Sequence, residues 1–122
     1  MLFRSYAVQN KMAYGRVKNA AGNFAKADLA GVTAAAAGAA ANMPDDFRVS
    51  ITNAPGKDAY PVSSFTWLLI PTKIADANKK KAIVDFLTWM LNDGQKMTET
   101  LTFASLPKPV IAKELKAIAK IQ

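Results

Sequence analysis

The side chains that most often carry out chemistry in enzymes are scarce in this sequence. Its 122 residues include neither cysteine nor histidine, which removes thiol nucleophiles, imidazole bases and the usual zinc ligands. Asp45 and Asp46 are adjacent, so their side chains diverge and make a poor acid and base pair. We find no glycine-rich phosphate loop and no nucleophile beside a base. We therefore predict no catalytic residue, no metal site and no cofactor, and we favour a binding or structural role over an enzyme.

The charge balance is basic, with 16 Lys and Arg residues against 9 Asp and Glu residues and a net charge of +7. Such a balance is compatible with a nucleic-acid or membrane partner. The lysines are nevertheless scattered along predicted helices, and the only run is Lys79, Lys80 and Lys81. We interpret them mainly as solvated helix faces. No apolar run approaches the roughly 18 residues needed to span a bilayer, and no signal peptide is recognisable at the start.

The predicted fold is organised around residues 52–71. Pro55 and Gly56 mark a turn at the start of this stretch. A β-branched and aromatic run follows between Pro61 and Pro71, which is typical of a strand. Its Leu-Leu-Ile end is apolar on both alternating faces, as in strands that are covered on both sides. We therefore predict a central strand of an α/β sheet with helices around it.

Helices are predicted on both sides of this strand in the sequence. Asp28 is suited to cap an alanine-rich helix, because alanine is the strongest helix former. Asp76 is suited to cap a second helix that ends near Asn92. Pro109 fits the first turn of the last helix. Shorter elements are a hairpin formed by residues 12–18 and 23–25, a strand over 47–52 and a short helix over 95–101.

Apolar spacing also predicts which side chains pack inside the C-terminal part. Helical periodicity places Phe86 and Leu87 on one apolar stripe, and an aromatic residue beside such a stripe is more often core than ligand. The expected anchors are Trp67, Phe86, Leu87, Trp89, Leu115 and Ile118, and the expected packing points of the loop over 102–106 are Phe103 and Leu106. On the last helix, we expect solvated side chains at Lys113, Lys116 and Lys120.

Three separated blocks of the sequence resemble a known family in the same order. They are YAVQNKMAYG (residues 6–15), TNAPGKDAYPVSSFTWLLIP (residues 52–71) and FLTWMLNDGQKMTETLTFASLPKPV (residues 86–110). They look like the C-terminal part of the periplasmic phosphate-binding proteins of Pst ABC transporters, the PstS-like family. The words DAYPVSS and FASLP are unusual and make the resemblance specific. It runs from Tyr6 to the end, whereas residues 1–5 do not match, and we expect this leader to result from truncation.

The resemblance implies an α/β fold, as part of a two-lobed periplasmic-binding-protein type II fold with mixed sheets flanked by helices, incomplete at the N-terminus. Residues 1–5 would be an unmatched leader and residues 6–59 the C-terminal part of one lobe. Residues 65–122 would be the C-terminal part of the other lobe. The interlobe crossover, or hinge, would consist of Tyr60, Pro61, Val62, Ser63 and Ser64.

The same resemblance implies a function for the longer protein. It would capture inorganic phosphate outside the cytoplasm and deliver it to the permease subunits of an ABC importer, as a monomer that binds no nucleic acid. The family's phosphate ligands would lie upstream, so this chain offers no identifiable phosphate-binding residue. Arg4, Arg16 and Arg48 are the arginines that remain, and none sits in a family ligand motif. A protein for another oxyanion and a basic nucleic-acid-binding module are the alternatives.

Overall fold

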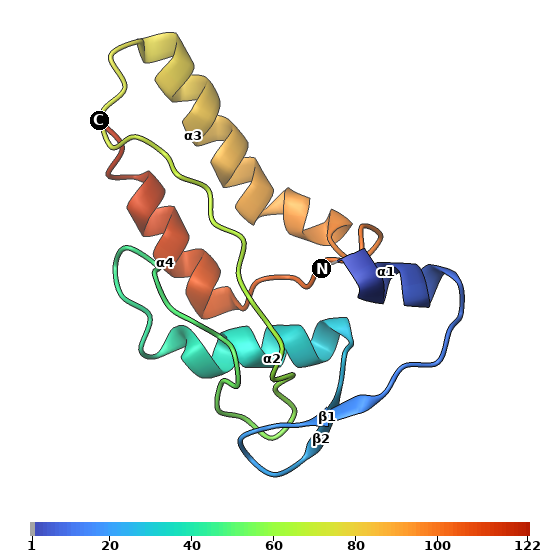
Figure 1. The fold of residues 1–122 in the computed structure, drawn as a ribbon. Coiled ribbons are helices and arrows are strands. Elements are labelled where there is room, and N and C mark those ends of the chain that lie inside the picture. The colour runs from blue at the N-terminus through green and yellow to red at the C-terminus, as the bar shows by residue number, and fades with distance from the viewer. Residues whose placement is uncertain (1) are drawn as a thin grey trace.

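The computed structural model describes the backbone of residues 2–122 and the side chains of residues 6–122. Within this part of the chain, helices dominate and two short strands form one small sheet (Figure 1). The protein is therefore a mixed α/β structure, as predicted at that coarse level. In chain order the elements are α1 (Leu2–Gln9), β1 (Arg16–Lys18), β2 (Phe24–Lys26), α2 (Leu29–Ala40), α3 (Ala77–Leu91), the 3-10 helix η1 (Asp93–Met97) and α4 (Lys108–Ile118).

The predicted hairpin is present as the antiparallel pair of β1 and β2. Val17 lies opposite Ala25 in the ladder, and the turn is closed by a 2.8 Å hydrogen bond from Asn19 N to Asn23 O. Gly22 has φ of 81°, a left-handed conformation that glycine adopts without steric penalty. The strands are shorter than the alternation over residues 12–18 suggested.

Helix α2 begins where the sequence predicted. The Asp28 side chain accepts a 2.8 Å hydrogen bond from Gly31 N, which satisfies one of the free N–H groups at the helix start. Its buried face consists of small residues and packs against the loop of residues 51–59. A Cβ atom at Gly38 would lie only 2.1 Å from Pro55 O, so the absence of a side chain permits this close approach. The expected small-residue helix is correct, but it packs on a loop and not on a sheet.

The two other predicted strands are wrong in this structure. Residues 47–52 and 62–70 have no strand assignment. The segment 65–71 is not covered on two sides either, since Trp67, Leu68 and Leu69 are 46%, 57% and 95% exposed. Side-chain composition favours an extended backbone, but a strand exists only when a neighbouring strand accepts and donates its ladder bonds. No such neighbour lies within the described residues.

Helices α3 and α4 form the C-terminal part and lie side by side (Figure 1). Asp76 caps α3 as predicted, because its carboxylate accepts hydrogen bonds from Asn78 N at 2.8 Å and Lys79 N at 3.0 Å. The following η1 replaces the short helix predicted over 95–101. Pro109 occupies the first turn of α4, where its missing N–H leaves no intrahelical bond unmade.

The predicted core of this part is largely wrong. Phe86 is 56% exposed and Trp89 is 47% exposed, and their rings pack on each other with centroids 6.0 Å apart. Phe103 is exposed as well. One neighbouring helix covers only part of an apolar stripe, and helical spacing does not reveal how much of the stripe is covered. Among the six expected anchors only Leu87 is buried, while the half-buried ones are Leu115 and Ile118.

Replacement of Gly38 tests the close approach of α2 and the loop. Replacing Gly38 with alanine gains about 1 kcal/mol of helix propensity, but the added Cβ forces the α2 helix and the Pro55 carbonyl apart. Overpacking of this kind costs about 1–3 kcal/mol, and a 2.1 Å approach to backbone belongs at the upper end. We expect a net loss of about 1–2 kcal/mol in the free energy of unfolding, measured by urea denaturation.

Gly15 provides the matched control, because nothing lies within 4 Å of a Cβ built there. Gly15→Ala should leave the urea midpoint unchanged or raise it slightly, since alanine restricts the unfolded chain. Equal midpoints for Gly38→Ala and the parent chain would show that α2 and the loop are not in close contact.

Glu114 on α4 gives a prediction about pH. Burial raises the pKa of Glu114 above its ordinary value, because desolvation disfavours the charged carboxylate. The folded chain then binds this proton more tightly than the unfolded chain. The stability that this tighter proton binding adds to the folded chain is fully present below the unfolded pKa of Glu, about 4.3. It is lost as pH rises through the raised pKa of Glu114 in the folded chain. Relative to the parent chain, Glu114→Gln should therefore gain stability as pH rises from 4 to 7.

The measurement is the difference in unfolding free energy between the two chains at several pH values. Glu99→Gln is the control substitution, because Glu99 is an exposed residue in the turn after η1. A constant difference for Glu114→Gln would contradict the raised pKa.

Candidate functional site

The first residues of the predicted hinge form backbone hydrogen bonds to α2 and to the loop that connects α2 with the hinge. Tyr60 N donates a 2.9 Å hydrogen bond to Gly31 O, and Asn53 N donates a 2.8 Å hydrogen bond to Pro61 O. Pro61 is buried, whereas Val62 is exposed. The first two residues of the predicted hinge are therefore held by the body that contains α2.

Ser63 is also bonded to this body, through its side chain and its carbonyl. Its side chain is buried, its hydroxyl donates a 2.7 Å hydrogen bond to Tyr60 O, and its carbonyl accepts a 3.3 Å hydrogen bond from the Thr52 hydroxyl. Ser64 is exposed and its hydroxyl donates only to the neighbouring Phe65 O. Backbone anchorage to the α2 body thus ends between Ser63 and Ser64.

Asn19 is a residue that the sequence reasoning treated only as part of a turn. It is buried, and the two N–H hydrogens of its side-chain amide are shared among the carbonyls of Gly56, Lys57 and Ala59, at 3.2, 2.9 and 3.0 Å from the nitrogen. Its side-chain oxygen accepts from Ala21 N and Asn23 N within the hairpin turn. One side chain therefore joins the hairpin to the loop that leads into residues 60–64. The local sequence shows a turn but carries no signal for a partner almost 40 residues away.

A shallow groove of about 360 Å³ lies between α4 and the segment that follows α2. Lys113 is only partly exposed, because its ammonium donates to Met43 O and lies 3.2 Å from an Asp45 carboxylate oxygen. The expectation that Lys113 is solvated is therefore wrong, while it holds for Lys116 and Lys120. The groove is lined by Asp45, Phe47, Pro109, Ala112, Lys113, Lys116, Ala117 and Lys120.

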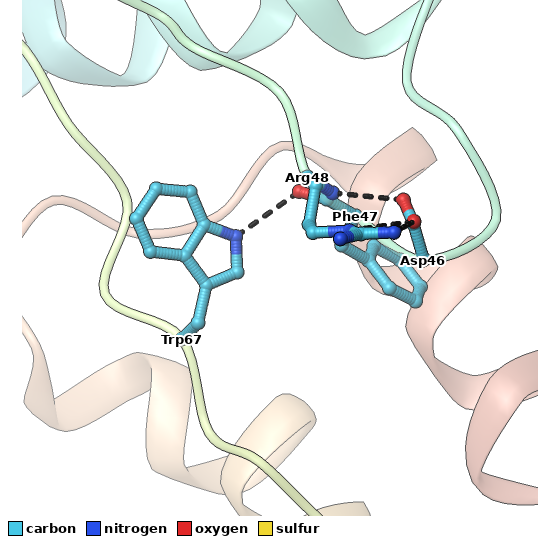
Figure 2. A network of polar contacts seen from close by, with 4 residues as sticks. All are labelled: Asp46, Phe47, Arg48 and Trp67. Carbon is cyan, nitrogen blue, oxygen red and sulfur yellow. Dashed lines mark hydrogen bonds and ion pairs between the residues drawn. The ribbon is translucent and has the colours of Figure 1, made fainter.

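Arg48, one of the arginines considered as a phosphate ligand, is already paired with a carboxylate. Arg48 Nε donates to Asp46 Oδ2 at 2.7 Å, and Arg48 Nη2 lies 2.6 Å from the same oxygen (Figure 2). The hydrogen bond from the Arg48 guanidinium holds the pKa of Asp46 below its ordinary value. Both groups are exposed, so the pair contributes little to stability. A guanidinium already satisfied by a carboxylate has less capacity left for a phosphate.

Phe47 links this loop to the extended segment that follows the predicted hinge. Its carbonyl accepts a 3.0 Å hydrogen bond from Trp67 Nε1 (Figure 2). Phe47 has φ of 59°, a left-handed conformation that is unfavourable for a bulky residue. The Trp67 indole therefore has a fixed polar partner although its ring is half exposed.

The remaining chemistry-bearing side chains do not come together. Arg16 lies on the exposed strand β1, and the structure shows no contact between it and Arg48. The side chain of Arg4 lies outside the described residues. Over residues 6–122, no group of three acidic residues could hold a metal ion. None of the described helices is long and apolar enough to span a bilayer.

Comparison with known proteins identifies relatives that share most of this chain. No protein-family model matches it. The phosphate-binding protein PstS of Xylella fastidiosa strain Temecula1 is 37% identical over 113 residues, which cover 93% of this chain and 31% of that protein. PstS of Methanocaldococcus jannaschii is 33% identical over 130 residues, covering 97% of this chain and 33% of that protein. PstS of Pasteurella multocida is 30% identical over 109 residues.

These matches confirm the resemblance to PstS proteins that the three sequence blocks indicated. The chain spans about a third of the length of the curated relatives it matches. The relatives' names describe binding proteins and not enzymes.

Asn19 gives a prediction from this geometry. Replacing Asn19 with alanine leaves three loop carbonyls and two turn N–H groups without their partner. Each lost hydrogen bond costs about 0.5–1.5 kcal/mol, and more where the orphaned group stays buried. We expect the free energy of unfolding to fall by about 2–4 kcal/mol, measured by urea denaturation.

Asn23→Ala is the control, because Asn23 is exposed and its amide makes one 3.3 Å hydrogen bond within the turn. Its effect should stay below about 1 kcal/mol. Asn19→Asp keeps the acceptor oxygen but turns a negative charge toward the three carbonyls, so it should destabilise at least as much as Asn19→Ala. A mild effect of both Asn19 variants would show that the amide does not hold the loop.

Proposed function

We propose that this chain is part of a substrate-binding protein that captures inorganic phosphate and delivers it to an ABC importer. The observation that carries the proposal is the 37% identity to a phosphate-binding protein PstS over 93% of the chain. A nucleic-acid-binding module is not favoured, because the relatives are named for phosphate binding. The scattered lysines and the paired Arg48 are in line with this preference.

The proposed partners follow from the same function. They are phosphate itself and the permease subunits of the importer, and the proposed location is the periplasm or another extracytoplasmic space. The full-length protein would act as a monomer. It would catalyse no reaction, since its role is to bind and release an ion.

The proposed architecture is a two-lobed periplasmic-binding-protein fold of type II. Residues 6–59 would belong to one lobe, residues 65–122 to the other, and residues 60–64 would be the crossover. The anchorage of Tyr60, Pro61 and Ser63 to the α2 body fixes the start of the proposed crossover, and Phe65 beyond it packs against the same core. A hinge absorbs its dihedral change in a few residues, and Ser64 is the first residue of this stretch whose described hydrogen bond is purely local.

In this proposal the chain supplies scaffold and not ligand. A tetrahedral oxyanion is bound by backbone N–H groups at helix starts, by hydroxyl groups and by an arginine. Helices α2 and α3 both begin at an aspartate whose carboxylate already accepts the first free N–H groups. The phosphate ligands would therefore come from segments that correspond to the part of the relatives outside the matched third.

The experiment measures phosphate binding by titration calorimetry. The 122-residue chain alone should bind phosphate no better than roughly millimolar, because exposed contacts contribute only about 0.3–1 kcal/mol each. A chimera should bind phosphate at about micromolar affinity or tighter. In this chimera, the chain replaces the matched 113 residues of Xylella fastidiosa PstS.

Sulfate is the control ligand in both titrations. It has the size and shape of phosphate but carries no proton at neutral pH, so a site that accepts the ligand's proton rejects it. A folded chimera that fails to bind phosphate would contradict the proposed function. Micromolar, phosphate-selective binding by the 122 residues alone would show that the chain contains the ligand residues itself.

A further inference from the structure

The positive charge of this chain is concentrated near its start. Five of the 16 Lys and Arg residues precede Asp28, whereas all 9 Asp and Glu residues lie at Asp28 or after it. Residues 1–27 therefore carry most of the net charge of +7. Such an asymmetry is typical of a segment that meets a polyanion or an anionic surface. The solvated helix faces inferred for other lysines do not explain it, because three of these five cations lie on strands.

These three cations share one face of the β1–β2 hairpin. Arg16 lies directly opposite Lys26 in the ladder, and Lys18 lies opposite Phe24. Opposite residues and alternate residues project from the same side of a strand pair, so these four side chains form one face, which we call the hairpin face. All four are exposed, whereas Ala25 on the other side is buried. In Figure 1 the hairpin lies at the lower edge of the molecule, beyond α2 as seen from α3.

The fold provides no acidic partner for the hairpin face. Within residues 6–122, no ion pair includes Arg16, Lys18 or Lys26. Lys26 Nζ instead lies 5.6 Å from the centroid of the Tyr14 ring, which is a cation–π contact. Two cations directly opposite each other destabilise a strand pair, so the stability of the hairpin does not explain why Arg16 faces Lys26. Three cations without an acid are also unsuited to burial inside a larger protein.

The aromatic ring on this face distinguishes between anionic partners. Phe24 is 64% exposed and lies on the same side as the three cations. A membrane surface suits both groups, because anionic lipids attract each lysine or arginine near them and apolar side chains such as Phe enter the boundary of headgroups and acyl chains. A stable protein partner would require an apolar centre from which charges are depleted, and the hairpin face has the opposite composition.

We propose that the hairpin face docks on an anionic lipid surface. Arg16, Lys18 and Lys26 would lie at the lipid phosphates, and the Phe24 ring would enter the headgroup region. Docking would keep the protein near the membrane that holds the proposed importer. The preference for lipid over nucleic acid rests on the proposed extracytoplasmic location, whereas docking itself is a separate property from phosphate capture.

The test is co-sedimentation of the 122-residue chain with lipid vesicles at physiological ionic strength. Vesicles of phosphatidylglycerol and phosphatidylcholine in equal parts should bind the chain at least about tenfold more tightly than vesicles of phosphatidylcholine alone. Added salt should weaken the binding, because it screens exposed charges. Equal binding to the two kinds of vesicle, or no binding to the anionic ones, would overturn the proposal. So would displacement by inorganic phosphate at the concentration of the lipid phosphate, since the face would then take the free ion.

A triple variant removes the three charges of the hairpin face. It combines Arg16→Gln, Lys18→Gln and Lys26→Gln. Each cation near an anionic surface strengthens binding about fivefold, so the variant should bind anionic vesicles about a hundredfold more weakly. Its urea midpoint should not fall substantially, because the substitutions also remove the repulsion between opposite residues.

The matched control removes three exposed lysines from α4 and the turn that follows it. It combines Lys108→Gln, Lys116→Gln and Lys120→Gln, so both triple variants have the same net charge. The control should retain most of the vesicle binding. Equal losses in the two variants would show that net charge alone attracts the chain and would contradict docking by the hairpin face.

The ring is tested without a change in charge. Phe24→Ser should weaken vesicle binding severalfold, because the apolar contact with the lipid is lost. Phe103→Ser is its control, since Phe103 is 65% exposed and lies in the loop before α4, and it should leave the binding unchanged. Unaltered binding by the Phe24 variant would refute the placement of the ring in the headgroup region.

Other polyanions and the chimera complete the test. Tighter binding to duplex DNA or to polyglutamate than to the anionic vesicles, at the same ionic strength, would overturn the choice of lipid. In the chimera with Xylella fastidiosa PstS, the triple variant of the hairpin face should lose vesicle binding and keep phosphate binding. Loss of phosphate binding with these substitutions would overturn the proposal, because the face would then serve the ligand. An unaltered chimera that binds vesicles but no phosphate would support docking and contradict the proposed function.

Discussion

The close contact between α2 and the loop of residues 51–59 is the constraint on which the N-terminal half depends. The core there is built mainly from alanines, with Ile51 as its only large, fully buried side chain. Alanine contributes little apolar area, so hydrophobic burial alone stabilises this contact weakly. Hydrogen bonds that hold the loop therefore contribute a larger share of the stability than they would in a core of leucines. Asn19 supplies them from the hairpin, and Gly38 allows the loop's backbone to come near enough to α2.

The parts of the fold that could be predicted are those determined by neighbouring residues. Asp28 and Asp76 cap helices because an N-cap side chain bonds to N–H groups two or three positions ahead. The β1–β2 hairpin follows from a turn between two short alternating runs. Strand status at residues 65–70 could not be decided in the same way, because it depends on a partner strand that the sequence pattern does not locate. The exposure of Trp89 has the same origin, since a helical stripe does not say which neighbour covers it.

The candidate site was predictable only in outline. The resemblance identified residues 60–64 as a crossover, and this assignment stays a prediction. The Asn19 bonds to residues 56–59 and the pairing of Lys113 with Asp45 join positions far apart in the sequence. Neither could be found from spacing, because lone polar residues of this kind are usually solvated. Phe47 was expected in a regular strand, but it has a left-handed backbone at the end of a turn in which Phe47 N donates to Pro44 O.

If the proposed phosphate-binding function and crossover hold, these contacts would affect how the two lobes close. Because Tyr60, Pro61 and Ser63 are bonded to the α2 body, the start of the proposed crossover would move together with α2. The Trp67 indole, which follows the proposed crossover, donates a hydrogen bond back to Phe47 O in the same body. Because anchors lie on both sides of Ser64, its motion is more restricted than in a free linker. A change in its dihedral angles would therefore have to break the Trp67 bond or carry the Phe47 loop along. Because that bond is exposed, water can replace it at a net cost of about 0.5–1.5 kcal/mol, which is small enough for phosphate binding by the proposed protein to supply.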